Sequence, residues 1–378
     1  MLVLRRLFCN WEESDMVEWK TIKELCCPLK KAIIKQGNLI NDGCYPVINS
    51  GISLYGYFNE YNNDGNAFTF ASRGEYAGFV TYIGEKFWAG GLCYPYRSKQ
   101  EDLYLTKYIY QYLKSKEKNI MDTLVMRGGI PALNKVDVEK ISIPIPSKSE
   151  QERIVSILDT FTSSISNLKE QIKERRKQYE YYRDQLLDLE GKDGVEMNIL
   201  KNIVDFRNGK GHEKSINPEG SYIVVNSKFI STNGQFKKYC NTQISPLYKD
   251  DILMVMSDLP HGKALAKCFL VEMDDKYTLN QRICALKVKD ESTVLTKYLF
   301  IILNRNKQLL AYDNGVDQTN LRKDDILNIS APIPTKQEQL RIVTILDQFE
   351  ASIANLEAQL KEREKQYEYY RNQLLTFE

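Results

Sequence analysis

The chain has 378 residues, of which 43% are hydrophobic and 27% charged, so it is large enough to bury two cores of its own. Its formal net charge is only +2, so composition alone does not demand a nucleic-acid partner, and any basic surface must be local. No apolar run approaches the roughly 18 residues that a membrane helix needs, and the first residues lack the apolar stretch of a signal peptide, which predicts a cytoplasmic protein.

The first predicted module spans residues 18–146 and follows residues 1–17, which we interpret as an N-terminal extension. Short runs of aromatic and β-branched residues, separated by Asn or Gly, predict strands at 45–48, 67–70 and 78–82. The segment 103–116 has the spacing of a helix. The pattern therefore predicts a module of mixed α/β structure.

A long amphipathic helix is predicted next, over residues 147–190. Its apolar side chains recur three and four residues apart, and Arg175 occupies one position of the series. No Gly or Pro interrupts it, and at about 1.5 Å per residue a helix of roughly 40 residues is about 60 Å long. The predicted seam residues are Leu158, Phe161, Ile165, Leu168 and Ile172, followed by Tyr179, Tyr182 and Leu186.

The second module, residues 191–334, and a second long helix, residues 335–378, repeat this order. Strands are predicted at 222–225, 252–255 and 283–286, and a helix from 293 to about 310. In the second seam Arg363 matches Arg175. The other seam residues are Leu346, Phe349, Ile353, Leu356 and Leu360, then Tyr367, Tyr370 and Leu374. We expect the two helices to pack on each other, antiparallel, within one chain; pairing between separate chains is the alternative.

The sequence contains one long segment twice. Residues 144–190 and 332–378 align without a gap and agree at roughly two of every three positions. A period of about half the chain is too long for a solenoid. The chain is therefore interpreted as an internal duplication of one unit. The middle parts of the two modules do not align. This is expected if the two modules recognise two different targets.

The repeated segment resembles the specificity subunits of type I restriction-modification systems. The resemblance rests on Pro144-Ile145-Pro146 and Pro332-Ile333-Pro334, on the Gln-x-Arg-Ile-Val steps at 151–155 and 339–343, and on the order module, helix, module, helix. It covers essentially the whole chain. The implied fold is α/β (α+β), with two globular target recognition domains joined by two long antiparallel coiled-coil helices in pseudo-twofold symmetry.

The same resemblance implies partners and a function. Each recognition domain would bind one half of a split target in double-stranded DNA, and the helices would act as the spacer. Two methyltransferase subunits and restriction (motor-nuclease) subunits would assemble on the chain. No membrane and no cofactor are implied.

Motifs for catalysis within the chain are weak. Asn217-Pro218-Glu219-Gly220 does not fit the Asn/Asp-Pro-Pro-aromatic motif of a methyltransferase, and no G-x-G-x-x-G is present. Eight Cys without a Cys-x-x-Cys pair and only two His predict no metal site, and reduced cysteines in the core. The carboxylate pairs Asp250-Asp251 and Asp324-Asp325 suit capping. We expect a non-catalytic subunit; the alternatives are a self-contained DNA-modifying or DNA-cleaving enzyme and a coiled-coil adaptor for proteins only.

Candidate DNA-binding residues are polar or cationic side chains in loops at strand ends, because base edges are recognised by such groups. Turn formation alone would also explain many of them. In the first module they are Ser72, Arg73, Tyr76 and Lys86, while Trp88 suits the core better. In the second they are Asn226, Ser227, Lys228, Ser257, His261, Lys263, Asn280, Gln281 and Arg282.

Overall fold

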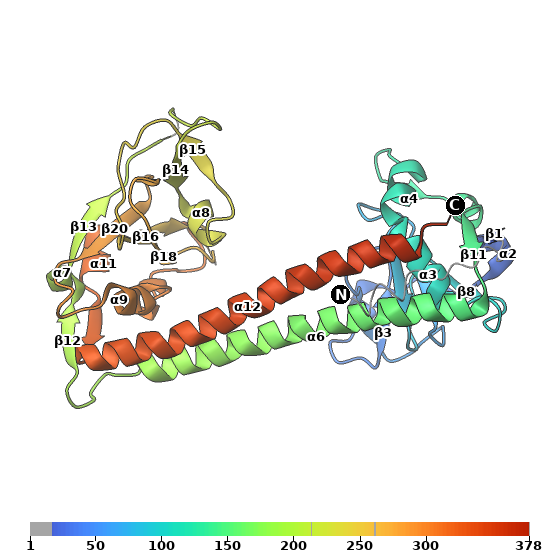
Figure 1. The fold of residues 1–378 in the computed structure, drawn as a ribbon, viewed down its shortest axis with the longest axis horizontal. Coiled ribbons are helices and arrows are strands. Elements are labelled where there is room, and N and C mark those ends of the chain that lie inside the picture. The colour runs from blue at the N-terminus through green and yellow to red at the C-terminus, as the bar shows by residue number, and fades with distance from the viewer. Residues whose placement is uncertain (1–16, 213, 261, 378) are drawn as a thin grey trace, which may run out of the picture. The chain divides into compact units, whose positions relative to one another are not determined.

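The structure, a computed structural model, describes residues 17–212, 214–260 and 262–377 (Figure 1). The predicted N-terminal extension therefore lies outside the described residues, apart from Val17. The chain divides into two compact units of mixed α/β structure. Met1–Glu170 with Glu357–Glu378 form unit 1, and Gln171–Leu356 form unit 2. Each unit thus contains one module together with part of both long helices.

Unit 1 is built on two small sheets. The larger has the strand order β2 (Cys26–Pro28), β8 (Cys93–Ser98), β5 (Ala67–Ala71) and β6 (Val80–Ile83), all antiparallel. The smaller has the order β4 (Gly56–Phe58), β3 (Tyr45–Ile48) and β7 (Trp88–Ala89), with β3 and β7 parallel. The strand predicted from Gly78 begins only at Val80, because Gly78 has a positive φ of 93° within the preceding turn.

Strand β5 is buried on both faces, so its sequence alternates by size rather than by polarity. Phe68 and Phe70 belong to the core cluster that contains Tyr108 of helix α3 (Thr106–Ser115). Ala67 belongs instead to a second cluster with Ile48 of the smaller sheet. Large side chains therefore face the helix and small ones allow the second sheet to approach.

Unit 2 has the same plan. Its larger sheet has the order β13 (Val204–Asn208), β20 (Ile283–Val288), β16 (Ile252–Val255) and β18 (Cys268–Leu270). Its smaller sheet has the order β15 (Lys238–Cys240), β14 (Tyr222–Val225) and β19 (Tyr277–Leu279), with β14 and β19 parallel. Strand β16 again divides its side chains between two cores, with Ile252 and Met254 in one and Leu253 and Val255 in the other.

The prediction of one continuous helix over 293–310 is wrong. The structure has two helices there, α9 (Thr296–Leu303) and α10 (Lys307–Leu310). Asn304 leaves the helix and its Oδ1 accepts a hydrogen bond from Cys268 N at 3.0 Å. Arg305 then adopts a positive φ of 59°, and Asn306 caps α10 by accepting from Gln308 N at 2.9 Å. Polar side chains thus break a run whose apolar spacing looked continuous.

Short elements complete both units. In unit 1, β1 (Glu18–Thr21) pairs with β11 (Ser142–Ile145); in unit 2, β12 (Glu196–Ile199) pairs with β22 (Ser330–Ile333). The remaining elements are α2 (Ile22–Leu25), η1 (Gln36–Asn38), α4 (Glu117–Thr123), β9 (Val125–Met126), β10 (Ala132–Leu133), α5 (Lys135–Glu139), α7 (Leu200–Ile203), α8 (Ser227–Ser231), β17 (Ser257–Asp258), β21 (Thr319–Asn320) and α11 (Lys323–Leu327).

The long helices are α6 (Lys148–Leu187) and α12 (Lys336–Leu374). Within unit 1 the first part of α6 packs on the last part of α12. The ring of Phe161 stacks on that of Tyr370, and Lys169 forms a 3.0 Å ion pair with Glu364. As the residue number rises along α6, the number of its contact partner on α12 falls, so the two segments are antiparallel. In unit 2 the equivalent stack joins Phe349 to Tyr182.

The seam residues differ in their surroundings. Leu158 and Leu346 are buried within the cores of their own units, and Ile172 is buried as well. Phe161, Ile165, Leu168, Phe349, Ile353, Leu356 and Leu360 are half-buried. Arg175 and Arg363 do not interrupt the packing, because their guanidinium groups lie over the rings of Phe349 and Phe161 at 5.8 and 5.7 Å.

The described cysteines are all free thiols. Cys26, Cys93, Cys240, Cys268 and Cys284 are buried, as predicted for core residues, whereas Cys27 is half-buried and Cys44 is exposed. Cys44 follows a turn at Asn41–Asp42 rather than lying in a strand, which is why it escapes the core. Among the described residues no helix is long and apolar enough to cross a membrane.

Candidate nucleic-acid interface

The strands of unit 2 bring four separate loops to one edge. Strands β14 and β19 are parallel and end together, so Asn226 and Asn280 follow side by side, and Asn280 N donates to Val225 O at 3.1 Å. Strand β16 ends where β20 begins, and Met256 N donates to Arg282 O at 2.9 Å. We call this set, residues 209–210, 226, 256–258 and 280–282, the strand-end edge of unit 2.

Several predicted DNA-binding residues at this edge also shape the backbone. The amide oxygen of Asn226 caps α8 by accepting from Phe229 N at 2.9 Å. Asn280 Oδ1 accepts from Gln281 N at 2.9 Å. Ser257 is buried, and its hydroxyl accepts from Gln318 Nε2 at 2.6 Å. The two Asn bonds use only the amide oxygen, and the amide nitrogen is the donor that an adenine N7 would require.

The exposed cationic and amide groups lie at or next to the same edge. Gln281 and Arg282 are exposed, and Arg282 has a positive φ of 68°. Half-buried Ser227 and exposed Lys228 directly follow Asn226; Lys228 Nζ lies 4.1 Å from the centroid of Phe236. Lys263 is exposed in the loop after β17. His261 lies outside the described residues.

The loop after β17 is fixed by one carboxylate. Asp258 Oδ2 accepts hydrogen bonds from Ala264 N at 2.7 Å and Leu265 N at 3.1 Å. Gly262 passes so close to Asp258 that a Cβ at this position would lie 2.1 Å from the carboxylate. The loop therefore needs Gly262, and it presents Lys263 on a constrained backbone.

Lys210 belongs to the strand-end edge although no sequence pattern predicted its position there. Its N–H donates to Leu279 O at 3.1 Å, and its carbonyl accepts from Gln281 N at 3.0 Å. His212 is buried and holds the same segment: its Nδ1 donates to Lys210 O at 2.7 Å, and its Nε2 is 2.9 Å from Thr278 Oγ1. A carbonyl can only accept, so the proton on Nδ1 is required.

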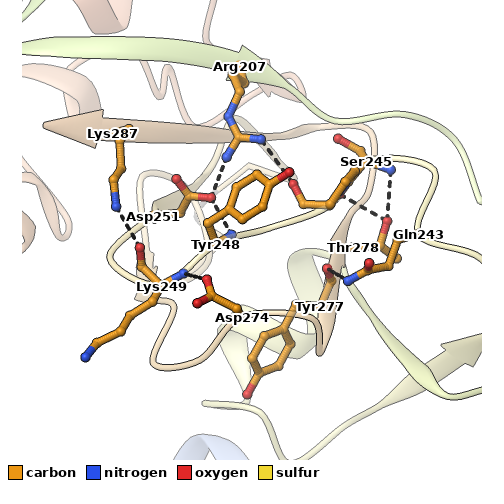
Figure 2. A network of polar contacts seen from close by, with 11 residues as sticks. Arg207, Gln243, Ser245, Tyr248, Lys249, Asp251, Asp274, Tyr277, Thr278 and Lys287 are labelled. Atoms are coloured by element: carbon orange, nitrogen blue, oxygen red, sulfur yellow. Dashed lines mark hydrogen bonds and ion pairs between the residues drawn. The ribbon is translucent and has the colours of Figure 1, made fainter. Parts of the chain in front are cut away.

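Thr278 connects this segment to a wider polar network (Figure 2). Its hydroxyl is 3.1 Å from both the N and the O of Ser245. Farther along the same loop, Asp251 pairs with Arg207, whose Nη1 also donates to Pro246 O at 3.1 Å. The loop between β15 and β16 is thus attached to β13 and β19.

Unit 1 has an equivalent edge, made by the same backbone bonds. Gly90 N donates to Ile48 O at 2.8 Å, matching the bond of Asn280, and Ser72 N donates to Leu92 O at 2.9 Å, matching the bond of Met256. Asn49 follows β3 as Asn226 follows β14, but its amide oxygen accepts from Leu92 N at 2.9 Å instead of capping a helix. We call residues 31–32, 49, 72–73 and 90–92 the strand-end edge of unit 1.

The predicted residues of unit 1 are distributed unevenly about this edge. Arg73 is exposed and bridges to Ala132, and Tyr76 is 36% exposed in the following turn. Ser72 is at the edge but buried. Lys86 precedes β7 whereas the edge lies after it, and its Nζ bonds to Tyr61 Oη at 3.0 Å. Trp88 is half-buried, donating to Ala32 O at 3.2 Å.

Two residues of this edge escaped the sequence prediction. Asn49 follows a strand that was predicted, so its position after β3 was the available signal. Lys31 had no such signal, because β2 was not predicted. Its Nζ donates to Gly91 O at 3.1 Å and lies 4.7 Å from the centroid of Tyr94.

Two of the carboxylates that were predicted from the sequence to act as caps, Asp325 and Asp251, have structural partners. Asp325 Oδ2 accepts from Arg322 N at 2.7 Å at the start of α11, which confirms a capping role. Asp251 caps no helix; it pairs with Arg207 and accepts from Tyr248 N at 2.8 Å. Residues 17–212, 214–260 and 262–377 contain no group of three or more His, Cys, Asp or Glu that could hold a metal ion.

The edges of unit 1 and unit 2 therefore share one backbone hydrogen-bond arrangement but differ in several side chains. Comparison with known proteins agrees with this duplication. The sequence matches the family "Type I restriction modification DNA specificity domain" twice, at residues 15–175 and 192–365. The chain thus contains two domains of this DNA specificity family. The chain belongs to this family.

Individual relatives match over most of their length. A Haemophilus influenzae protein named as a type I restriction enzyme specificity subunit is 28% identical, with 97% of each chain covered. The EcoR124I/EcoR124II specificity subunit of Escherichia coli is 31% identical over 72% of this chain and 71% of its own. The crystal structure of an S subunit from M. genitalium has the same fold, with a TM-score of 0.67 over 98% of both chains at 18% identity.

Proposed function

We propose that this chain is the DNA-sequence-reading subunit of a type I restriction-modification complex, and that each strand-end edge reads one half of a two-part target. The observation that carries the proposal is the duplicated edge with unlike side chains. Asn280 and Arg282 in unit 2 stand where unit 1 has Gly90 and Leu92. The same frame with different hydrogen-bonding groups suits two different base sequences.

The residue types fit base recognition. Arginine binds guanine O6 and N7 with two hydrogen bonds, and Asn does the same for adenine N6 and N7, each pair being worth about 1–3 kcal/mol of discrimination. Arg73 in unit 1 and Arg282 in unit 2 are the exposed arginines at the edges. Lys31 and Lys210 belong to the edges, and Lys228 and Lys263 lie within five residues of the unit 2 edge in sequence. These lysines suit phosphate contacts, which position a protein without reading bases.

The low net charge implies that the chain does not bind DNA strongly alone. Nonspecific affinity for DNA comes mainly from neutralised phosphates, and the chain carries a net charge of only +2. We infer that methyltransferase subunits supply the missing cationic surface and the chemistry, and that motor-nuclease subunits join for cleavage. The chain itself would be non-catalytic.

The paired helices would set the number of unread base pairs between the two half-sites. On this proposal the functional parts are two recognition domains, residues 18–146 and 191–334, with spacer helices over 147–190 and 335–378. The antiparallel contacts inside each unit, such as Phe161 with Tyr370, support a fixed helix register.

The decisive experiment is to produce the chain together with its methyltransferase partner in cells that lack other modification, and to sequence the methylated DNA. The proposal expects a motif of two specified halves separated by an unspecified gap of constant length. A continuous motif would contradict it. Methylation or cleavage by the purified chain alone would favour the self-contained enzyme, and the absence of any motif with the partner present would favour a protein-only adaptor.

A further inference from the structure

Each long helix is fastened to its own module by one buried glutamine. In unit 1 the side chain of Gln151, in the first turn of α6, is wholly buried. Its Oε1 accepts from Leu105 N at 2.9 Å. Its Nε2 donates to Leu103 O and to Pro146 O, both at 3.0 Å. One planar amide thus joins the helix, the strand end before it and the loop that leads into α3.

Unit 2 repeats this arrangement at Gln339, which is also wholly buried. Its Oε1 accepts from Leu295 N at 2.8 Å, and its Nε2 donates to Thr293 O and Pro334 O, both at 2.9 Å. An apolar residue would fill the same space without these bonds. A buried amide is tolerated only when its partners are placed to satisfy it, so it selects one geometry over others.

Two further contacts surround each glutamine. In unit 1 Tyr108 donates to Pro144 O at 2.8 Å, and Lys107 of α3 pairs with Asp159 of α6 at 2.7 Å. In unit 2 the same contacts are made by Tyr298 with Pro332 O at 2.8 Å and by Lys297 with Asp347 at 2.6 Å. We call each set of contacts, centred on Gln151 or Gln339, a joint.

The two joints make the same contacts, whereas the two strand-end edges carry different side chains. This contrast suggests that joints and edges have different roles. The edges carry the side chains that would distinguish bases. The central amides of the joints are buried and bonded within their own unit, so they are not available to contact bases. What they determine is the direction in which each long helix leaves its module.

We propose that Gln151 and Gln339 are positioning residues that set the length of the unread gap by fixing the angle between each module and its helix. This inference rests on the proposed function. A small angle suffices, because a tilt of about 3° over a helix about 60 Å long displaces its far end by roughly 3 Å, the rise of one base pair. Loss of the amide bonds therefore broadens the choice of gap without changing the bases that are read.

The test substitutes Gln339→Met, which keeps the side-chain length and removes the three hydrogen bonds. The matched control is Gln337→Met, an exposed glutamine in the same helical turn. Each variant is assembled with the methyltransferase subunit and assayed on DNA duplexes that carry the wild-type half-sites with the wild-type gap, one base pair fewer or one more.

The measured quantity is the ratio of methylation rates between the altered gaps and the wild-type gap. For Gln339→Met we expect this ratio to rise at least about tenfold, which corresponds to about 1.4 kcal/mol of lost discrimination, with both half-site sequences unchanged. For Gln337→Met it should stay at the wild-type value. A general loss of stability would lower all three rates together and leave the ratio unchanged.

An unchanged ratio for Gln339→Met in an assembled complex would overturn the positioning role. If that variant does not assemble, Gln151→Met replaces it, because this change removes the three matching amide bonds in unit 1; a raised ratio then supports the role and an unchanged one overturns it. A wild-type complex that shows no two-part target would remove the proposed function itself, an outcome distinct from a two-part target with an unaltered gap ratio.

Discussion

The ring of Phe161 on α6 stacks on the ring of Tyr370 on α12, with centroids 5.3 Å apart and planes 30° from parallel. Arg363, one heptad before Tyr370, places its guanidinium over the same Phe161 ring at 5.7 Å. One aromatic ring therefore contacts two seam positions that lie two helical turns apart, and a slip by one heptad would break both contacts. We call this three-residue contact the clamp of unit 1.

Removing the clamp should destabilise unit 1. For Phe161→Ala we expect the free energy of unfolding to fall by about 2 kcal/mol, less than for a fully buried Phe because this side chain is half-buried. Urea denaturation followed by tryptophan fluorescence measures the change. Tyr369→Ala is the control, since that side chain is 61% exposed. Equal effects of the two substitutions would argue against the clamp.

The spacer helices can be lengthened at a position that leaves the clamp contacts intact. Unit 2 has an equivalent clamp of Phe349 with Arg175 and Tyr182, so the stretch of α6 between Phe161 and Arg175 belongs to neither. Seven residues inserted after Gln171, and seven after the matching Gln359, preserve the heptad phase and add about 10 Å to each helix. We expect the gap to grow by roughly 3 base pairs, as about 3.4 Å separates successive pairs.

Methylome sequencing of cells that carry this insertion and the methyltransferase checks the prediction. Insertion of seven residues beside Arg175, between it and Tyr182, is the control, because it splits the unit 2 clamp and should impair assembly. New bases within a half-site, at an unchanged gap, would mean that the helices do not set the spacing.

The pair of Arg207 with Asp251 should matter for the stability of unit 2. The Asp251 side chain is only 2% exposed, so Arg207→Ala leaves a buried carboxylate without its cation. We expect a loss of about 2–3 kcal/mol, below the value for a fully buried pair because Arg207 is 38% exposed. Adding Asp251→Asn to Arg207→Ala should recover part of this loss in urea denaturation. A second substitution that only adds to the damage would contradict the pairing.

Single substitutions at the two edges should affect different halves of the target. Arg282→Asn removes the guanidinium of unit 2 while keeping a residue type that tolerates the positive φ of this position. Arg73→Ala does the same for unit 1. Each should weaken discrimination at one half-site by about 1–3 kcal/mol if the contact is bidentate to guanine. Competition binding with duplexes altered in one half at a time provides the readout; an effect on both halves would speak against separate readers.

The thiols should differ sharply in reactivity. Burial raises the pKa of Cys26, Cys93 and Cys284 to about 12, so these groups stay protonated at pH 8 and cannot attack an alkylating reagent as thiolates. In a Cys9→Ser background we expect iodoacetamide to label the exposed Cys44 first. Peptide mass spectrometry after native labelling tests this order. Labelling of Cys284 at the rate of Cys44 would be inconsistent with the packed core.

The features that could be predicted from the sequence are those that depend on the local spacing of apolar residues. Strand β14, for example, begins and ends at the predicted residues, and the seam at Phe161 and Phe349 follows from heptad spacing. The break at Asn304 was missed because apolar spacing carries no information on a side chain that leaves the helix to bond elsewhere.

The strand-end edges could be predicted only in part, because they depend on pairing between distant segments. Asn226 and Asn280 were each recognisable at a strand end, but only the parallel pairing of β14 with β19 makes them neighbours. Lys210 joins them through two backbone bonds, one to Leu279 and one to Gln281, and follows no recognised motif. Lys86 looked equivalent to the other cations, yet it precedes its strand and bonds to Tyr61.

The division of α12 between the units has a consequence for synthesis. The core of unit 1 includes Leu374 and Leu375, which the ribosome makes only after all of unit 2. Until then, the apolar face of α6 around Phe161 has no partner from its own chain. Unit 1 therefore completes its folding last although its module emerges first, and a nascent chain interrupted within α12 would expose that face to chaperones and proteases.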